Sequence, residues 1–193
     1  MQQFIQNPIL PGFNPDPSVI RVGEDFYIAT STFEWFPGIR IHHSKDLVHW
    51  RLVGHVLTRR DQIDMRGFNN SDGVWAPALS YADGKFWITF SCTHNSRGGA
   101  WMSTPCYVVT AEDIAGPWSD PTPIGGSGFD PSLFHDDDGR KWIVNMTWDG
   151  RAGYNKFGDI TVQEFDSENG KLIGERIGIF SGTALGCTEG PQI

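Results

Sequence analysis

The sequence feature that most constrains the fold is an internal repeat marked by proline. Four short motifs recur along the 193 residues, and their prolines are separated by 60, 54 and 60 positions. Each of the first three motifs is followed by a polar turn and an aromatic run, as in Asp83-Gly84-Lys85-Phe86-Trp87. An Asp-Gly pair between apolar runs is a strong hairpin signal. The four marker residues are Pro17, Pro77, Pro131 and Pro191.

The length of this repeat is informative about the architecture. A unit of about 55 to 60 residues that holds several short antiparallel strands has the size of a propeller blade, and no segment shows a useful length of helical periodicity. We therefore predict an all-β fold, a β-propeller of which residues 1–193 supply about three blades and the start of a fourth. Propellers typically have four to eight blades. We thus expect an N-terminal part of a longer propeller, with exposed blade faces and low stability on its own.

Composition excludes several classes of partner. The chain carries 15 basic and 23 acidic side chains, a net charge of −8, so neither nucleic acid nor an anionic membrane is an expected partner. No apolar run approaches the roughly 18 residues of a membrane helix. The N-terminus lacks a signal-peptide pattern, and Cys92, Cys106 and Cys187 match neither a zinc pattern nor a disulfide framework. We expect a cytoplasmic protein with reduced thiols.

Acidic residues stand beside the marker prolines. The first strand of each blade lines the central channel of a propeller, so equivalent positions of successive blades converge on one axis. Asp16 and Asp130 immediately precede their prolines, Glu189 lies two positions before the fourth, and blade two offers the aromatic Trp75 instead. We expect the three carboxylates to meet near the axis; turn or capping roles stay an alternative.

Such a cluster suits glycoside hydrolysis. An inverting glycosidase uses one carboxylate as general base on a water molecule and a second, protonated one to protonate the leaving oxygen, with the two roughly 6.5–9.5 Å apart. A third carboxylate raises the pKa of the acid by like-charge repulsion. Aromatic side chains around the cluster would stack on the apolar faces of sugar rings. The expected partner is therefore an oligosaccharide.

Five motifs, in order and covering essentially the whole chain, resemble family 43 glycoside hydrolases, and most of all their β-xylosidase branch. These motifs contain Asn14-Pro15-Asp16-Pro17-Ser18, Thr32-Phe33-Glu34-Trp35-Phe36-Pro37-Gly38, Val74-Trp75-Ala76-Pro77, Gly128-Phe129-Asp130-Pro131-Ser132 and Thr188-Glu189-Gly190-Pro191. The resemblance implies a five-bladed propeller and hydrolysis by a single displacement. By motif match, Asp16 would be the general base, Glu189 the general acid, and Asp130 the residue that modulates the pKa and position of the acid.

The resemblance also implies a sugar pocket. Phe33 and Trp75 match positions that line the pocket for the non-reducing-end sugar, and Trp148 is a further candidate for its wall. The implied activity is release of xylose from the non-reducing end of β-1,4-xylo-oligosaccharides, with removal of α-L-arabinofuranosyl groups as a further one. The remaining blades and the C-terminal β-sandwich typical of this branch lie outside residues 1–193, so we do not expect full activity from these residues alone.

Several alternatives remain at this point. A retaining, invertase-like propeller would use Asp16 as nucleophile with a carboxyl separation nearer 5 Å, and a lectin would need the aromatic walls without the acid and base. No metal site is predicted, because His42 and His43 point to opposite faces of a strand and Asp136-Asp137-Asp138-Gly139 lacks the spacing of a calcium loop. No cofactor is expected; a structural calcium ion and a homo-oligomer of the full-length protein stay open.

Overall fold

The computed structural model describes residues 4–96 and 102–193, and the elements it defines there are all strands. They form three antiparallel four-stranded sheets, in each of which consecutive strands are neighbours. Their bounds are β1 (Ser18–Val22), β2 (Asp25–Thr30), β3 (Gly38–Ser44), β4 (Arg51–Leu57), β5 (Gly73–Ala82), β6 (Lys85–Thr93), β7 (Cys106–Ala111), β8 (Thr122–Gly125), β9 (Gly128–His135), β10 (Lys141–Trp148), β11 (Phe157–Asp166) and β12 (Lys171–Phe180). The prediction of an all-β fold made of propeller blades is confirmed.

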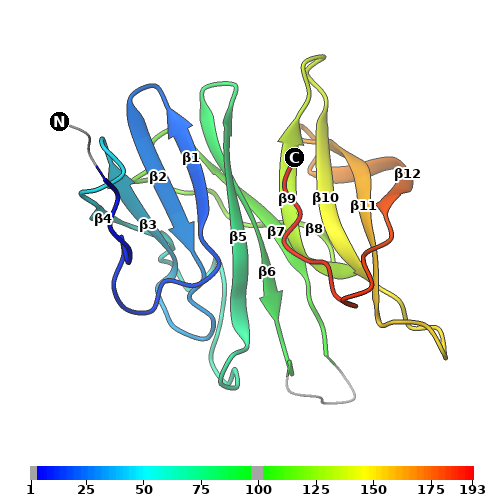
Figure 1. Cartoon of the computed structure of the whole chain (residues 1–193). Helices are drawn as coiled ribbons and strands as arrows, with labels where there is room; N and C mark the ends of the chain where they lie inside the picture. The colour runs from blue at the N-terminus through cyan, green and yellow to red at the C-terminus, as the bar shows by residue number, and fades with distance from the viewer. Residues whose placement is uncertain (1–3, 97–101) are drawn as a thin grey trace.

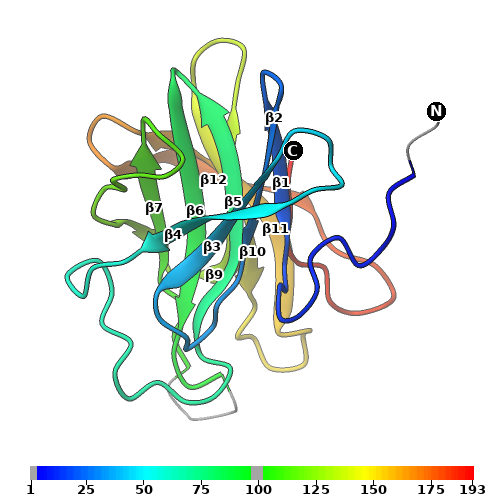
Figure 2. The same ribbon diagram turned by 90° about the vertical axis from the view of Figure 1, so that its left-hand side faces the viewer.

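The three sheets stand side by side like blades (Figure 1). Their first strands, β1, β5 and β9, lie next to one another, and the hairpins β1–β2, β5–β6 and β9–β10 point toward the same end in both views (Figure 2). A hydrogen bond joins two of the inner strands, from the amide of Leu79 to Ser18 Oγ at 3.0 Å. Successive sequence repeats therefore form similar sheets arranged around a common axis, and equivalent residues of the first strands face that axis. Within the described residues the three sheets do not close into a ring.

The core lies between the blades. One apolar cluster joins blades one and two, with Ile41 and Leu57 packed near Phe90. A second joins blades two and three through residues such as Trp87 and Leu133. Strand β6 is covered on both faces, and all but its first residue are buried. Its apolar residues fill the core, and the buried hydroxyls of Thr89 and Ser91 bond the backbone of β9 at Pro131 and Asp130.

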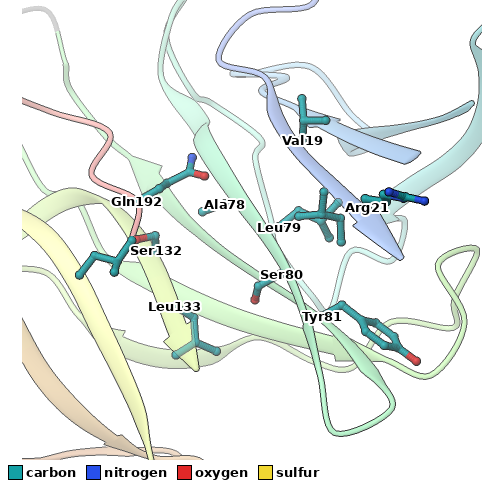
Figure 3. A pocket seen from close by; sticks show the side chains of 11 residues that line it. Val19, Arg21, Ala78, Leu79, Ser80, Tyr81, Ser132, Leu133 and Gln192 are labelled. Carbon is teal, nitrogen blue, oxygen red and sulfur yellow. The ribbon is translucent and has the colours of Figure 1, made fainter. Parts of the chain in front are cut away.

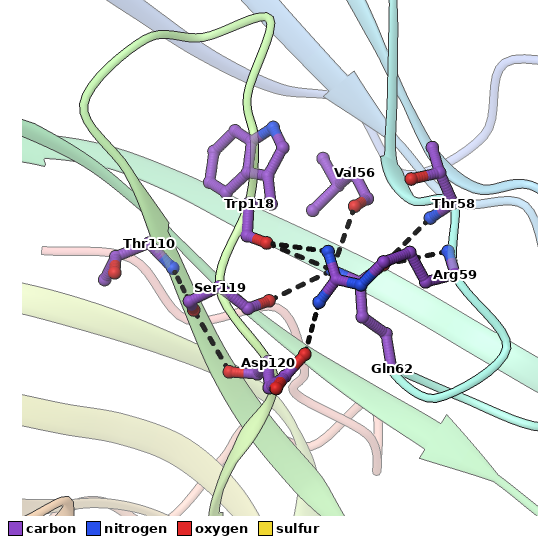
Figure 4. Close-up of polar contacts among 8 residues, drawn as sticks. All are labelled: Val56, Thr58, Arg59, Gln62, Thr110, Trp118, Ser119 and Asp120. Atoms are coloured by element: carbon purple, nitrogen blue, oxygen red, sulfur yellow. Dashed lines mark hydrogen bonds and ion pairs between the residues drawn. The ribbon is translucent and has the colours of Figure 1, made fainter.

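A loop between β4 and β5 fastens blade one to blade two (Figure 4). Gln62 is buried and donates from Nε2 to the carbonyl oxygens of Trp118, at 3.4 Å, and Ser119, at 3.0 Å. Arg59 donates from Nη1 to the Trp118 carbonyl at 3.2 Å and pairs with Asp120. These bonds satisfy backbone carbonyls that the β7–β8 connection leaves without ladder partners.

The fourth repeat behaves differently from the first three. Residues 181–193 contain no strand, although we expected the inner strand of a fourth blade there. A strand needs a ladder partner, and the described residues supply none to this segment. It nevertheless runs beside β9, since Gln192 and Ser132 line one cavity and the amide of Gly190 binds the carboxylate of Asp130. The exposed apolar side chains on β12, including Ile177 and Phe180, agree with the expectation of uncovered blade faces.

Two further findings concern the cysteines and membrane insertion. All three cysteines are free thiols, with Cys92 and Cys106 buried and Cys187 half-buried. In the part of the chain that the structure describes, no helix has the length and apolar character needed to cross a bilayer.

Candidate active site

The residue before each marker proline has an unusual backbone conformation. The φ angles are 51° at Asp16, 28° at Ala76, 54° at Asp130 and 63° at Gly190. Non-glycine residues at positive φ carry a cost of about 1–3 kcal/mol and cluster at functional sites. At Ala76 the ladder between β5 and β6 skips register between Trp75 and Ala78. Bulges of this kind redirect a side chain, and the β9–β10 ladder shifts register at the corresponding point of blade three, between the pairs Ser132–Val144 and Phe129–Met146.

The structure brings the three predicted carboxylates together. Asp16, Asp130 and Glu189 all line a cavity of about 380 Å³, and all three also border an adjoining hollow of about 230 Å³. They come from the starts of the first, third and fourth repeats, 59 or more positions apart in the sequence. Their convergence follows from the repeat, because Asp16 and Asp130 occupy the same place in their units and Glu189 stands one position earlier in its own.

Asp130 lies deepest in this cluster. Its side chain belongs to a residue that is only 8% exposed, and its amide donates to Ser91 Oγ at 3.0 Å. Burial, followed by repulsion from Glu189 and Asp16, raises the pKa of Asp130 to about 7, against the opposing effect of a hydrogen bond from the Gly190 amide. The carboxyl of Asp130 therefore holds its proton to a higher pH than an ordinary aspartate does.

This raised pKa predicts a pH-dependent gain in stability for Asp130→Asn. Between about pH 4 and pH 7 the folded state holds a proton that the unfolded state has released, so the parent loses stability as the pH rises through this window. The amide of Asn stays neutral throughout. We expect nearly equal free energies of unfolding at pH 4 and a variant more stable by about 4 kcal/mol at pH 8, measured by urea unfolding. The exposed Asp137→Asn is the control, and an equal gain there would contradict the assignment.

Aromatic rings form the wall of the cavity. Phe33, Trp75, Phe129, Trp148 and Phe157 follow one another, with ring centroids 6.3 Å, 5.9 Å, 4.9 Å and 5.6 Å apart. All five line the cavity of the carboxylates. The structure therefore places the three predicted wall residues together at one site.

Both indole groups of the wall are held by hydrogen bonds at their edges. Trp75 donates from Nε1 to the carbonyl of Ser71 at 2.8 Å, and Trp148 donates to Thr104 Oγ1 at 3.1 Å. Because the polar edge of each ring is bound by protein, the apolar faces remain for the cavity. Rings fixed in this way are suited to stack on a sugar without losing further side-chain freedom.

Sequence reasoning missed several residues of the site. Lys156, at the end of the β10–β11 connection, and Phe157, the first residue of β11, both line the cavity, but no sequence motif shared with the other repeats marks them. Phe129 carried a usable signal, because it stands where Trp75 stands in blade two. The sequence predicts only a reduced thiol at Cys187, yet this residue donates from Sγ to Glu189 Oε2 at 3.3 Å. Burial, with Glu189 adding to it, raises the pKa of Cys187 to about 11, so this thiol stays protonated as a donor.

A further cavity of about 350 Å³ lies along the inner strands (Figure 3). Val19, Ala78, Ser132 and Gln192 from the successive repeats border it, and none of its described lining residues is acidic. It therefore has no acid or base for hydrolysis. Among residues 4–96 and 102–193, no group of three or more His, Cys, Asp or Glu side chains is arranged to hold a metal ion.

Comparison with known proteins gives a consistent result. The family model described as glycosyl hydrolases family 43 matches residues 5–193. The chain is 66% identical over its whole length to a protein named xylan 1,3-beta-xylosidase from Vibrio sp, covering 36% of that relative. It is 58% identical over 98% of its length to xylosidase/arabinosidase 43B of Humicola insolens, covering 35% of it.

Solved structures agree with the sequence relatives. The crystal structure of a xylan beta-1,4-xylosidase from Bacillus halodurans C-125 superposes with a TM-score of 0.94 at 58% identity, covering 98% of this chain and 36% of that one. The chain thus spans about a third of the length of the curated relatives it matches. On its sequence, its fold and the arrangement of its carboxylates, the chain belongs to glycosyl hydrolases family 43.

Proposed function

We propose that the polypeptide carrying this chain is an inverting, exo-acting glycosidase that releases xylose from the non-reducing end of β-1,4-xylo-oligosaccharides. The observation that carries the proposal is the convergence of Asp16, Asp130 and Glu189 on one cavity with an aromatic wall. Two carboxyl groups are the minimum for this chemistry. The cavity, at about 380 Å³, lies in the lower part of the range for small-molecule sites and suits the end of a saccharide better than a long polymer.

In this proposal the carboxylates have distinct roles. Asp16 accepts a proton from a water molecule as that water attacks the anomeric carbon, and Glu189 donates its proton to the leaving glycosidic oxygen. The C–O bond to the leaving group breaks as the bond to water forms, and the configuration inverts. Burial, and after it repulsion from Glu189 and Asp16, raises the pKa of Asp130 to about 7, so in this proposal Asp130 tunes the pKa of the acid.

The first experiment measures release of sugar by the full-length polypeptide that contains residues 1–193. Xylobiose should be cleaved to xylose. With an aryl β-xyloside, which releases a single sugar, proton NMR should show the α-anomer first, as single-displacement attack on a β-linkage requires. First appearance of the β-anomer would replace the proposal with a retaining mechanism. Calorimetric binding of xylobiose without any cleavage would indicate a carbohydrate-binding module instead.

The sugar and the linkage need separate substrates. The Vibrio relative is named for the 1,3 linkage and the solved Bacillus halodurans structure for the 1,4 linkage, so the β-1,3- and β-1,4-linked disaccharides should be compared by kcat/KM. A second activity, removal of α-L-arabinofuranosyl groups, is supported by the name of the Humicola relative and by a 39% identical arabinofuranosidase of Bacteroides ovatus. An aryl arabinofuranoside tests it directly.

A further inference from the structure

A fourth carboxylate, outside the acid–base cluster, is buried close to the aromatic wall. Asp72 is 1% exposed and immediately precedes β5, the strand that carries Trp75. Its side chain is not among those that line the cavity, so it does not contact a bound sugar. A buried ionised group is costly unless its oxygens are fully hydrogen-bonded, which makes its partners informative.

Five donors surround the two oxygens of Asp72. Oδ2 accepts from the amide and Nδ2 of Asn69, at 3.2 Å and 3.1 Å, and from the amide of Asn95 at 3.1 Å. Oδ1 accepts from the amide and hydroxyl of Ser96, at 2.8 Å and 2.6 Å. Burial raises the pKa of Asp72, but the bonds from Ser96, Asn95 and Asn69 outweigh it and bring the pKa to about 2. The carboxylate is therefore ionised at working pH and ties two separate segments together.

The first of these segments fixes Trp75. The carbonyl of Ser71, next to Asp72, accepts the indole N–H of Trp75 at 2.8 Å. The amide of Ser71 donates to Glu34 Oε2 at 3.0 Å, and this glutamate adjoins Phe33. The turn that Asp72 closes thus contacts both the edge of Trp75 and the loop that carries Phe33.

The residues after Asp72 hold Phe33 directly. Gly73 has φ +90°, and a Cβ there would lie 2.2 Å from the carbonyl oxygen of Phe33. Beyond it, Val74 and Phe33 exchange two backbone hydrogen bonds, at 3.0 Å and 2.9 Å. The backbone at Gly73 can approach the backbone of Phe33 this closely only because glycine has no Cβ and because the preceding turn is correctly placed. The second segment contributes Ser96, which lines the cavity.

We infer that Asp72 is a positioning residue for the sugar pocket, because it joins the turn behind Trp75 and Phe33 to the segment that places Ser96. The inference rests on the proposed function. It assigns Asp72 to binding and not to the chemical step, since the wall contacts the sugar equally in the ground state and the transition state. Loss of such uniform binding raises KM and leaves kcat unchanged.

The test is Asp72→Asn in the full-length polypeptide. The amide nitrogen of Asn would face N–H donors in place of an acceptor, so several bonds are lost at once. With an aryl xyloside we expect KM to rise about 10-fold or more while kcat stays within about 3-fold, and the pH optimum of kcat should not move. Asp46→Asn is the matched control, because Asp46 accepts from Ser44, Val48 and His49 within one distant turn; its KM should equal that of the parent.

A milder variant covers the case in which Asp72→Asn does not fold. Asn69→Ala removes one exposed side-chain donor to Asp72, and we expect KM to rise about 3-fold with kcat unchanged. An active parent whose variants lower kcat alone, or leave KM at the value of the Asp46→Asn control, would overturn the inference and leave the proposed function standing. A parent that releases no pentose would overturn the proposed function, and the inference with it.

Discussion

Asp16→Asn should lower kcat for xylose release by about 10³-fold or more with every substrate. Asn cannot accept the proton of the attacking water, and no leaving group, however good, supplies a base. Asp16 lies at the start of blade one, where its φ of 51° directs it to the cavity shared with Asp130 and Glu189. The substitution keeps the shape of the side chain, so stability should change little. The measurement is steady-state release of xylose from xylobiose and from aryl xylosides.

Glu189→Gln should give a different pattern, because the general acid matters only when the leaving oxygen needs a proton. On xylobiose we expect a loss of about 10²–10⁴-fold in kcat. On an aryl xyloside with a strongly acidic phenol the loss should shrink to about 10-fold or less, since such a phenolate departs unprotonated. The two variants therefore separate base from acid by their dependence on the leaving group.

The control for both variants is Asp137→Asn. Asp137 is exposed in the β9–β10 hairpin, on a turn that the cavity does not include. Its kinetics should match the parent. If Asp16→Asn kept more than a tenth of the parental kcat, or if it showed the same leaving-group dependence as Glu189→Gln, the assignment of the two roles would be wrong.

The repeat in the sequence predicts most of the architecture for a physical reason. Each copy carries its own hairpin signal and its own apolar alternation, so local propensity and global fold agree. The marker prolines also locate the three carboxylates, because the starts of successive repeats face one axis. Asp16 and Asp130 immediately precede their prolines, and Glu189 stands one position further from its own. Recognition of a repeated unit thus predicts long-range proximity that no local pattern contains.

The remaining details of the site depend on loops that do not repeat. Lys156 ends the β10–β11 connection and Phe157 follows it as the first residue of β11. Asp72 acts through a turn between β4 and β5. The left-handed backbone at Asp16 and Asp130 could not be predicted from the sequence either. A residue before proline is normally extended, and here the tertiary structure imposes a positive φ instead. In the fourth repeat the sequence motif around Glu189 is present, but no strand forms there. A motif alone therefore does not predict a strand.

The tightest backbone contact near the site leads to the second large effect. Gly128 begins β9, two residues before Asp130, and a Cβ added there would lie 1.6 Å from the carbonyl oxygen of Met146 and 2.7 Å from Thr147 Cα. Both contacts are to backbone of the paired strand β10, which no side-chain rotation can relieve. The strands would have to separate at the bulge where their register already shifts.

Gly128→Ala should therefore destabilise the protein by about 3 kcal/mol or more and displace Phe129 and Asp130 from the cavity. The matched control is Gly54→Ala, also within a strand, where nothing lies within 4 Å of the added Cβ; it should leave the free energy of unfolding unchanged or raise it by up to about 1 kcal/mol. Urea unfolding of both variants decides the question. Equal midpoints would mean that β9 and β10 do not pack as closely as the structure shows, and the position of Asp130, which this packing fixes, would then lose its support.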